Sequence, residues 1–251
     1  MNDVVIVPTH GRPEMLLHCL EHLEACPDLA NADVRIVVDQ HQHKRIPAAV
    51  HHETLDVIAG FTHRGWKLTV RDRHFYWGNS FNVLTAYKES FAAGHPLTFL
   101  VEDDVMVEPG FFAWHRAVHE SEQLFCSIAS ANTRSGQLRT KDDFASLGVC
   151  FPLASLGLIV PHARVAYFIN MGKYCVDTFG GDSKLFCEQD GLILRIMKQA
   201  GGTARYPETP LARHVGDYGY NRGLANQPGG DLQARYRAIG ERIRDKTFRV
   251  I

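Results

Sequence analysis

The sequence predicts an α/β fold built around a doubly wound, mostly parallel β-sheet. Short apolar segments alternate with amphipathic segments of helical periodicity between residues 4 and 101. This alternation is typical of βαβ units, whose right-handed crossovers place successive strands in one sheet. Strands that are buried on both faces have continuous apolar sequences, as these segments do.

The expected elements follow one another in chain order. Pro13 suits the first turn of a helix, and Leu16, Leu20 and Leu23 then recur at helical spacing. Gly94 is expected to end a later helix. Strands are predicted for residues 4–7, 34–38, 68–70 and 97–101, and the helices between them are predicted from Pro13 onward, over 51–61 and over 83–91.

The second half of the sequence alternates less regularly. No internal repeat or low-complexity linker divides the chain, so we expect a single domain over residues 1–251 with two functional halves, 1–125 and 126–251. The pieces expected after residue 110 are a helix at 111–124, a strand at 125–131, a polar loop at 134–143, an apolar segment at 149–160, a glycine-rich segment at 170–183, a helix around Leu192 and a charged helix at 232–245.

Composition and charge exclude several classes of protein. The 251 residues include 27 lysines and arginines and 28 acidic residues, so no overall basic excess favours nucleic acid or an anionic membrane. None of the six cysteines forms a C-x-x-C pair, and their scatter suits buried thiols in a reducing compartment. The N-terminus lacks the pattern of a signal peptide, and no apolar run approaches the ~20 residues of a membrane span. We therefore expect a cytoplasmic protein without a membrane span.

Three acidic residues, Glu102-Asp103-Asp104, directly follow the apolar run at 97–101. Adjacent carboxylates repel one another, and a divalent cation removes that repulsion. Mg²⁺ and Mn²⁺ prefer oxygen ligands and often use one or two carboxylates together with substrate phosphates. The alternative is a solvated acidic turn before a helix. The position after a buried strand favours the metal site.

Polar residues also follow two other predicted strands. Thr9 comes after the first strand and Asp39 ends the second. Parallel, doubly wound sheets bind ligands at the carboxyl ends of their strands. We therefore expect Thr9, Asp39 and the acidic triplet to converge at one edge of the sheet.

Two segments carry a resemblance to a known family. The segment 4–13, VVIVPTHGRP, resembles the opening strand and loop of family-2-type glycosyltransferases. The segment 99–112, FLVEDDVMVEPGFF, resembles their DxD region and is especially similar to that of eukaryotic N-acetylglucosaminyltransferase I. The resemblance covers residues 4–125. It implies a GT-A, Rossmann-like fold with an irregular acceptor-side second half.

The resemblance also implies an activity. It is metal-dependent transfer of a sugar from a nucleoside-diphosphate donor, with UDP favoured, to an acceptor hydroxyl with inversion. The implied cofactors are Mn²⁺ or Mg²⁺ and the nucleotide-sugar. The sequence does not identify the acceptor, which could be a glycan, a lipid carrier, a small molecule, a protein or a modified nucleobase. It also leaves the oligomeric state open.

Each residue of the donor side receives an implied role. Asp104 would bind the metal, and His214 would be the late histidine that completes the metal or diphosphate site. Turn formation is the ordinary alternative for Thr9 and Asp39. The remaining implied roles are Asp103 at the ribose, Glu102 at the donor sugar, Thr9 and Arg12 near the nucleotide base, and Asp39 at the base or ribose.

The segment 71–82 resembles the Gly-x-x-x-Asn segment that precedes the DxD strand in this family, with Gly78 and Asn82 at the matching positions. Arg73 could meet a phosphate, because a guanidinium suits phosphate geometry. Asn79 and Ser80 are the ordinary residue types for capping the next helix, and we interpret them so.

The segment 186–195, FCEQDGLILR, resembles the second acidic motif, where inverting transferases place the base that deprotonates the acceptor. The usual Glu-Asp pair is here Glu188-Gln189, and the aspartate has moved to Asp190. Either Glu188 or Asp190 could be the base, and we favour Asp190 at the start of the helix. Acids that favour a helix N-terminus are the ordinary alternative.

Two competing functions remain open from the sequence. A nucleotidyltransferase shares the doubly wound nucleotide fold and uses acidic metal sites, although the segment 11–13 is too short for its usual glycine-rich loop. A non-catalytic nucleotide-sugar-binding module would lack a working base. His115 and His119 have metal-binding i, i+4 spacing but lack the H-E-x-x-H form, so we interpret them as a solvated helix face.

Overall fold

The computed structural model describes residues 2–39, 46–72, 79–130, 148–162, 189–216 and 229–244. Within these residues, a seven-stranded sheet has the order β3-β2-β1-β4-β7-β6-β8, and a small second sheet pairs β5 with β9. The large sheet is made of β1 (Asp3–Thr9), β2 (Ala32–Val38), β3 (Leu68–Asp72), β4 (Leu97–Leu100), β6 (Cys126–Ile128), β7 (Val149–Pro152) and β8 (Ala204–Arg205), and the small one of β5 (Val105–Val107) and β9 (Ala212–His214).

The pairing of the first four strands is parallel throughout. β1 lies between β2 and β4, and β3 extends the sheet beyond β2. Antiparallel pairing begins at β7, which lies between β4 and β6. The predicted mostly parallel sheet is confirmed, and strands from both halves of the chain share it.

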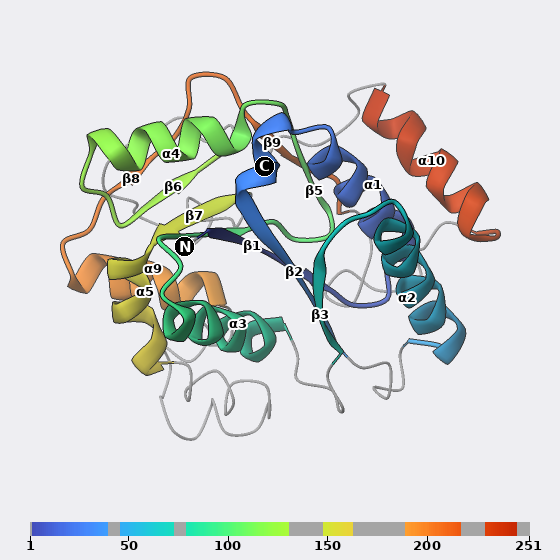
Figure 1. Ribbon diagram of the computed structural model, residues 1–251, viewed down its shortest axis with the longest axis horizontal. Helices are drawn as coiled ribbons and strands as arrows, with labels where there is room; N and C mark the ends of the chain where they lie inside the picture. The colour runs from blue at the N-terminus through green and yellow to red at the C-terminus, as the bar shows by residue number, and fades with distance from the viewer. Residues whose placement is uncertain are drawn as a thin grey trace.

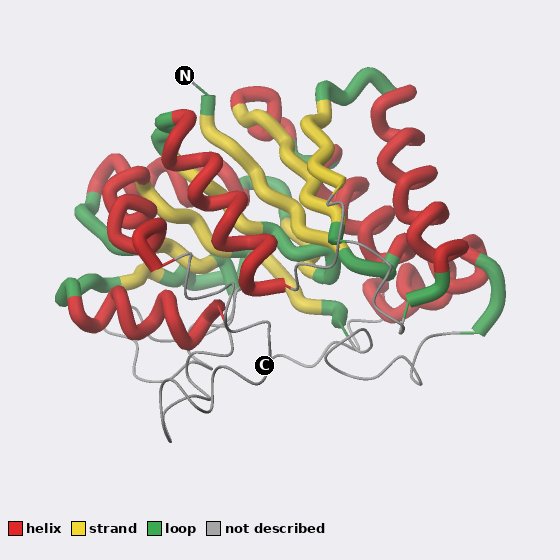
Figure 2. The backbone as a smooth tube through the Cα atoms, turned by 90° about the horizontal axis from the view of Figure 1, so that it is seen from below, coloured by secondary structure: helices red, strands yellow, loops and turns green. Residues whose placement is uncertain are grey.

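Helices cover both faces of the large sheet, as Figures 1 and 2 show. On one face α1 packs beside α2 and α10, and on the other face α3 packs beside α5 and α9. The helices, including the two short 3-10 turns η1 and η3, are α1 (Pro13–Glu24), η1 (Pro27–Asn31), α2 (Ala48–His63), α3 (Asn79–Ala93), α4 (Phe111–Ser121), α5 (Leu153–Ile159), η3 (Val160–His162), α9 (Gln189–Gln199) and α10 (Leu232–Arg244).

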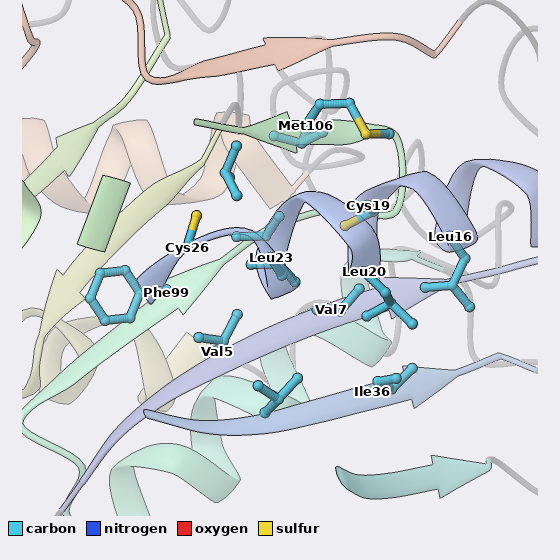
Figure 3. Packing of buried hydrophobic residues seen from close by; sticks show 14 of the residues in the cluster. Val5, Val7, Leu16, Cys19, Leu20, Leu23, Cys26, Ile36, Phe99 and Met106 are labelled. Atoms are coloured by element: carbon cyan, nitrogen blue, oxygen red, sulfur yellow. The ribbon is translucent and has the colours of Figure 1, made fainter. Parts of the chain in front are cut away.

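The central strand β1 divides the core into two apolar layers. All seven of its residues are buried, and successive side chains of a strand point to opposite faces. Val5 and Val7 therefore join the cluster under α1, while Val4 and Ile6 join the cluster under α3. Figure 3 shows the first cluster, in which α1 lies over Val5 and Val7, and Met106 of β5 lies above the helix.

The segment 149–160 divides into two elements. Its first residues form β7, and Leu153 begins α5. The predicted helix at 111–124 ends at Ser121, and the strand expected at 125–131 is limited to Cys126–Ile128. None of the helices in the described ranges has the length and apolar character that a membrane crossing requires.

The interpretation of His115 and His119 as a solvated helix face is wrong. His115 is fully buried, and its Nδ1 lies 2.6 Å from Ser127 Oγ, which also lies 2.9 Å from His119 Nε2. Ser127 of β6 thus lies within hydrogen-bond distance of both histidines of α4. Burial lowers the pKa of His115, so this imidazole is neutral.

Candidate functional site

The polar residues at the strand ends converge at one edge of the sheet, as predicted. Thr9 ends β1, and Asp39 N donates a hydrogen bond to Thr9 O at 3.1 Å, which continues the β1–β2 pairing. Thr9 Oγ1 also donates to Asp103 Oδ2 at 2.7 Å. The parallel register brings these residues together, because β1, β2 and β4 all end on the same side.

Arg12 is bound to two members of the acidic triplet. It lies at the N-cap position of α1, and its guanidinium makes ion pairs with Asp103 and Asp104. Burial by itself would lower the pKa of Arg12, but the two carboxylates raise it above its usual value. The site therefore contains an internal cation at the carboxylates that the sequence assigns to a metal and a ribose.

Asp104 is held from the opposite side by the second half of the chain. β9 pairs with β5 so that Val105 lies opposite His214, and Val215 N donates to Asp104 O at 2.8 Å. His214 Nε2 then lies 3.2 Å from Asp104 Oδ2. Burial opposes ionisation of Asp104, but Arg12 and His214 hold its pKa below the usual range. Asp104 is thus an ionised, buried carboxylate.

Gly216 packs directly against this pair. A Cβ atom at position 216 would overlap Asp104 Oδ2 and would lie 2.7 Å from His214 Nε2. The glycine is therefore required by the close approach of the 212–216 segment to Asp104. From the sequence, the glycines after His214 are expected to let a loop close over the donor, and the close packing of Gly216 against Asp104 is not visible at that level.

Glu102 is anchored by two side-chain amides. Asn79 Nδ2 and Gln189 Nε2 both donate to Glu102 Oε1, at 3.4 and 3.2 Å. Burial, followed by the charges of Asp104 and Asp190, raises the pKa of Glu102 to about 8. Asn79 thus contacts the acidic triplet from the first residue of α3, a contact that its interpretation as a capping residue did not include.

The other predicted residues are distributed as follows. Asp190 lies in the first turn of α9, beside Gln189. Asn82 Nδ2 donates to Val37 O at 3.3 Å, so this side chain fastens α3 to β2. Asp39 is 3% exposed. Arg73, Gly78 and Glu188 lie outside the described residues.

The donor atoms at Asp104 suit a hard divalent cation that also uses ligand phosphates. Among the described residues, no group of three histidine, cysteine or acidic side chains is arranged to hold a metal ion. Asp104 and His214 supply a carboxylate and an imidazole side by side, and Asp104 Oδ1 is buried without a hydrogen-bond partner in the described structure. Mg²⁺ sites commonly use one or two carboxylates and complete their coordination with phosphate oxygens and water. The residues therefore fit such an ion.

Comparison with known proteins shows similarity in fold. No protein-family model matches the sequence, and no curated protein sequence matches it. The chain is similar to Staphylococcus aureus TarS 1–349 in complex with UDP-GlcNAc, with a TM-score of 0.55 and 12% identity over 97% of this chain and 66% of that one. It is also similar to mannosyltransferase PcManGT from Pyrobaculum calidifontis in complex with GDP-Man and Mn²⁺, with a TM-score of 0.54 and 12% identity over 87% of this chain and 58% of that one.

A third similar structure belongs to another class. It is a Bacillus anthracis protein assigned as a glucose-1-phosphate thymidylyltransferase, with a TM-score of 0.50 and 9% identity over 95% of each chain. The present chain covers 66% and 60% of the TarS chain in two TarS structures and 58% of PcManGT. It therefore spans less than two thirds of the length of either protein. These similarities, together with the mostly parallel sheet between helices, show a GT-A, Rossmann-like fold.

Proposed function

We propose that this chain is a metal-dependent glycosyltransferase that moves a sugar from a nucleoside-diphosphate donor, UDP favoured, to an acceptor hydroxyl. The observation that carries the proposal is the pair formed by Asp104 and His214 at the carboxyl edge of the sheet. His214 Nε2 and Asp104 Oδ2, the two atoms that could coordinate a metal, are 3.2 Å apart. Asp104 Oδ1 has no hydrogen-bond partner in the described structure. Proteins of similar fold have been solved with UDP-GlcNAc and with GDP-Man and Mn²⁺.

In this proposal Asp104 and His214 hold Mn²⁺ or Mg²⁺, with Mn²⁺ the better match to an imidazole ligand. The ion, when bound, offsets the negative charge that builds on the departing diphosphate. Arg12, which pairs with Asp103 and Asp104, would offer its guanidinium to the diphosphate, a group that it suits geometrically. Asp103 stays fixed by Thr9, which donates to its Oδ2, and accepts a hydrogen bond from the ribose. Asp39 faces the base or ribose.

The acceptor side depends on Asp190, which we propose as the general base. The acceptor hydroxyl loses its proton to the Asp190 carboxylate as its oxygen bonds to the anomeric carbon. The bond from that carbon to the diphosphate oxygen breaks, and the diphosphate leaves with the electron pair. Attack opposite to the leaving group inverts the anomeric centre. Glu188 is the alternative base.

The proposed division of the single domain gives donor binding to residues 1–125 and acceptor binding to 126–251. His214 and Gly216 are exceptions, because they reach Asp104 from the second half. A cytoplasmic location is also proposed. Its support is that Cys19, Cys26, Cys126 and Cys150 are all buried and free of disulfides, as suits a reducing compartment.

Metal-dependent donor binding is the decisive test. The full chain would be titrated with UDP, UDP-glucose, UDP-N-acetylglucosamine and GDP-mannose, in Mn²⁺ and in EDTA. We expect binding of a uridine nucleotide in Mn²⁺ only, and its loss in Asp104→Ala. Metal-independent binding, or no binding of any of the four, would overturn the proposal.

The base assignment needs a separate readout. Donor hydrolysis or transfer should fall by at least ~100-fold in Asp190→Asn, as general bases typically contribute 10²–10⁴-fold, while donor affinity stays unchanged. Retained turnover would contradict the assignment of Asp190.

The similarity to a protein assigned as a thymidylyltransferase supports one competing function, transfer of a nucleotidyl group. That reaction joins a nucleoside triphosphate and a sugar phosphate and releases pyrophosphate. Pyrophosphate release from a nucleoside triphosphate and glucose 1-phosphate, without hydrolysis of any nucleotide-sugar, would favour it.

A further inference from the structure

Gln189 lies where the two halves of the chain meet around Glu102. It is the first residue of α9, it is 4% exposed, and its Nε2 donates to Glu102 Oε1 at 3.2 Å. The same carboxylate oxygen accepts the Asn79 amide at 3.4 Å. Two amides from separate helices therefore fix one oxygen of Glu102, and the carboxylate cannot turn without losing both hydrogen bonds.

This contact gives a hydrogen-bond partner to the amide nitrogen of Gln189 but not to its amide oxygen. Its Oε1 is buried and has no hydrogen-bond partner within the described structure. A buried acceptor without a donor is unfavourable, because it has lost its hydrogen bonds to water. Glu102 Oε1 also accepts the Asn79 amide, so this oxygen is the acceptor in the network and the Gln189 nitrogen is the atom that donates to it. The nitrogen therefore faces Glu102, and the amide oxygen is left for a donor that the described residues do not supply.

The surroundings specify the chemistry of that donor. Glu102 directly precedes Asp103 and Asp104 at the proposed donor site, and Asp190, the proposed base, adjoins Gln189. Two acidic residues, Glu102 and Asp190, adjoin the Gln189 amide, so an anionic ligand group is disfavoured here. A neutral group with O–H or N–H donors fits, and sugars present such groups.

We propose that Gln189 recognises the donor sugar: its amide nitrogen holds Glu102 in place, and its amide oxygen accepts a hydrogen bond from a hydroxyl or amide N–H of the transferred sugar. This inference rests on the proposed function and names a specificity-determining residue for it. The departure from the usual acidic pair at this position then has a reason. A neutral amide can donate to Glu102, whereas an ionised carboxylate at position 189 has no hydrogen to donate and would add a negative charge beside Asp190.

The experiment separates affinity for the sugar from affinity for the nucleotide. Binding of UDP, UDP-glucose and UDP-N-acetylglucosamine in Mn²⁺ would be measured for the full chain and for Gln189→Met and Gln189→Glu. The methionine keeps the volume and removes both polar atoms, and the glutamate keeps the shape and removes the donor. The matched control is Gln199→Met, at the exposed far end of the same helix.

We expect the unaltered chain to bind a UDP-sugar more tightly than UDP. Both variants at Gln189 should lose at least tenfold in affinity for that UDP-sugar and stay within twofold for UDP. Gln199→Met should resemble the unaltered chain. Retained UDP binding also shows that a variant is folded. If one of the two Gln189 variants does not fold, the result for the other variant tests the inference.

Four outcomes overturn the inference, and they separate a failure of the proposed function from a failure of the role of Gln189. If the unaltered chain binds none of the nucleotides, the proposed function fails and the inference with it. If it binds UDP and UDP-sugars equally, or if the Gln189 variants keep the preference for the sugar, the proposed function stands and the role of Gln189 is wrong. An equal loss for UDP and UDP-sugars would mean that Gln189 supports the fold of the site without contacting the sugar.

Discussion

Arg12 places one guanidinium against the carboxylates of both Asp103 and Asp104, and the side chains of these two aspartates are only 1% and 7% exposed. Two buried anions and one cation form the centre of the candidate site without any ligand. Arg12 therefore performs, in the protein by itself, the charge compensation that we assign to a divalent cation in the donor complex.

Arg12→Met should destabilise the metal-free protein and make its stability depend on Mn²⁺. Removing one partner of a buried ion pair costs about 3–5 kcal/mol, and the partial exposure of Arg12 favours the lower end of that range. At roughly 2–4 °C for each kcal/mol, the Tm should fall clearly in EDTA and recover in part with Mn²⁺. Thermal unfolding in both conditions measures this.

The control for this prediction is Arg64→Met. Arg64 and its partner Glu24 have side chains that are 47% and 39% exposed, and such surface pairs contribute about 0–1 kcal/mol. Its Tm should change little and should not respond to Mn²⁺ differently from the unaltered protein. An equal loss of Tm for Arg12→Met with and without Mn²⁺ would show that the cation does not replace Arg12.

Gly216→Ala should abolish metal-dependent donor binding while the protein remains folded. The added methyl group would displace Asp104 Oδ2 or His214 Nε2, which it meets at the site itself. We expect at least a tenfold loss of affinity for Mn²⁺ together with UDP, measured by calorimetry. Gly60→Ala is the matched control, because its Cβ meets nothing within 4 Å and alanine stabilises a helix interior by about 0.5–1 kcal/mol. Unchanged binding in Gly216→Ala would refute the proposed metal position.

The raised pKa of Glu102 predicts a stability that falls as the pH rises. Its folded pKa of about 8 lies above its ordinary value of 4.5, so between these pH values the folded state binds more protons than the unfolded state. By linkage, the free energy of unfolding falls over that range. Glu102→Gln removes this group while its amide oxygen still accepts from Asn79 and Gln189.

The measurement is the Tm of both metal-free proteins from pH 5 to pH 8.5. The Tm of Glu102→Gln minus that of the unaltered protein should grow with pH up to about 8 and then stay level. A difference that is constant or shrinks with pH would contradict the raised pKa.

Arg235→Met should destabilise the protein from a point outside the candidate site. Glu14, in the first turn of α1, is completely buried, and Arg235 Nε of α10 lies 3.4 Å from its Oε2. Removing the cation leaves a buried carboxylate whose pKa is already raised by burial, at a cost of about 3–5 kcal/mol. Urea unfolding gives the magnitude.

A double variant and a control complete this prediction. Glu14→Met with Arg235→Met should recover part of the loss, since Glu14 is then not buried alone, although Glu53 still lacks its ion pair with Arg235. Arg237→Met, on the exposed face of the same helix, should change the free energy of unfolding by no more than about 0.5 kcal/mol. If the double variant is as unstable as Arg235→Met, the ion pair is not the cause.

The sequence was sufficient for the first half of the fold because β1, β4 and the end of β2 are buried on both faces. β1 and β4 are nearly continuous apolar runs bounded by polar residues, and periodicity identifies such segments well. The segment 149–160 was ambiguous for the same reason, since a short apolar run suits a strand and a buried helix equally. His115 was misjudged because its Nδ1 finds a buried partner, Ser127, on the separate strand β6, and no local pattern signals such a partner.

The sequence predicted where in the fold the candidate site lies, but not the contacts within it. Parallel strand order was enough to expect Thr9, Asp39 and the acidic triplet at one edge. The contacts of Gln189 with Glu102 and of Gly216 with Asp104 join residues that are far apart in the chain. They depend on how β9 and α9 pack against the donor half, which spacing and residue type do not encode.

The short ladder between β5 and β9 also sets an order of events during synthesis of the chain. Asp104 and Arg12 leave the ribosome early and can pair at once, whereas His214 and Gly216 arrive only after the strands of the large sheet have been made. A nascent chain therefore carries its aspartate neutralised by its own arginine, without the imidazole that completes a cation site. If Asp104 and His214 hold the metal as proposed, the capacity to bind it is acquired last, and a chain shortened to end before Ala212 should bind no Mn²⁺ even when its first four strands fold.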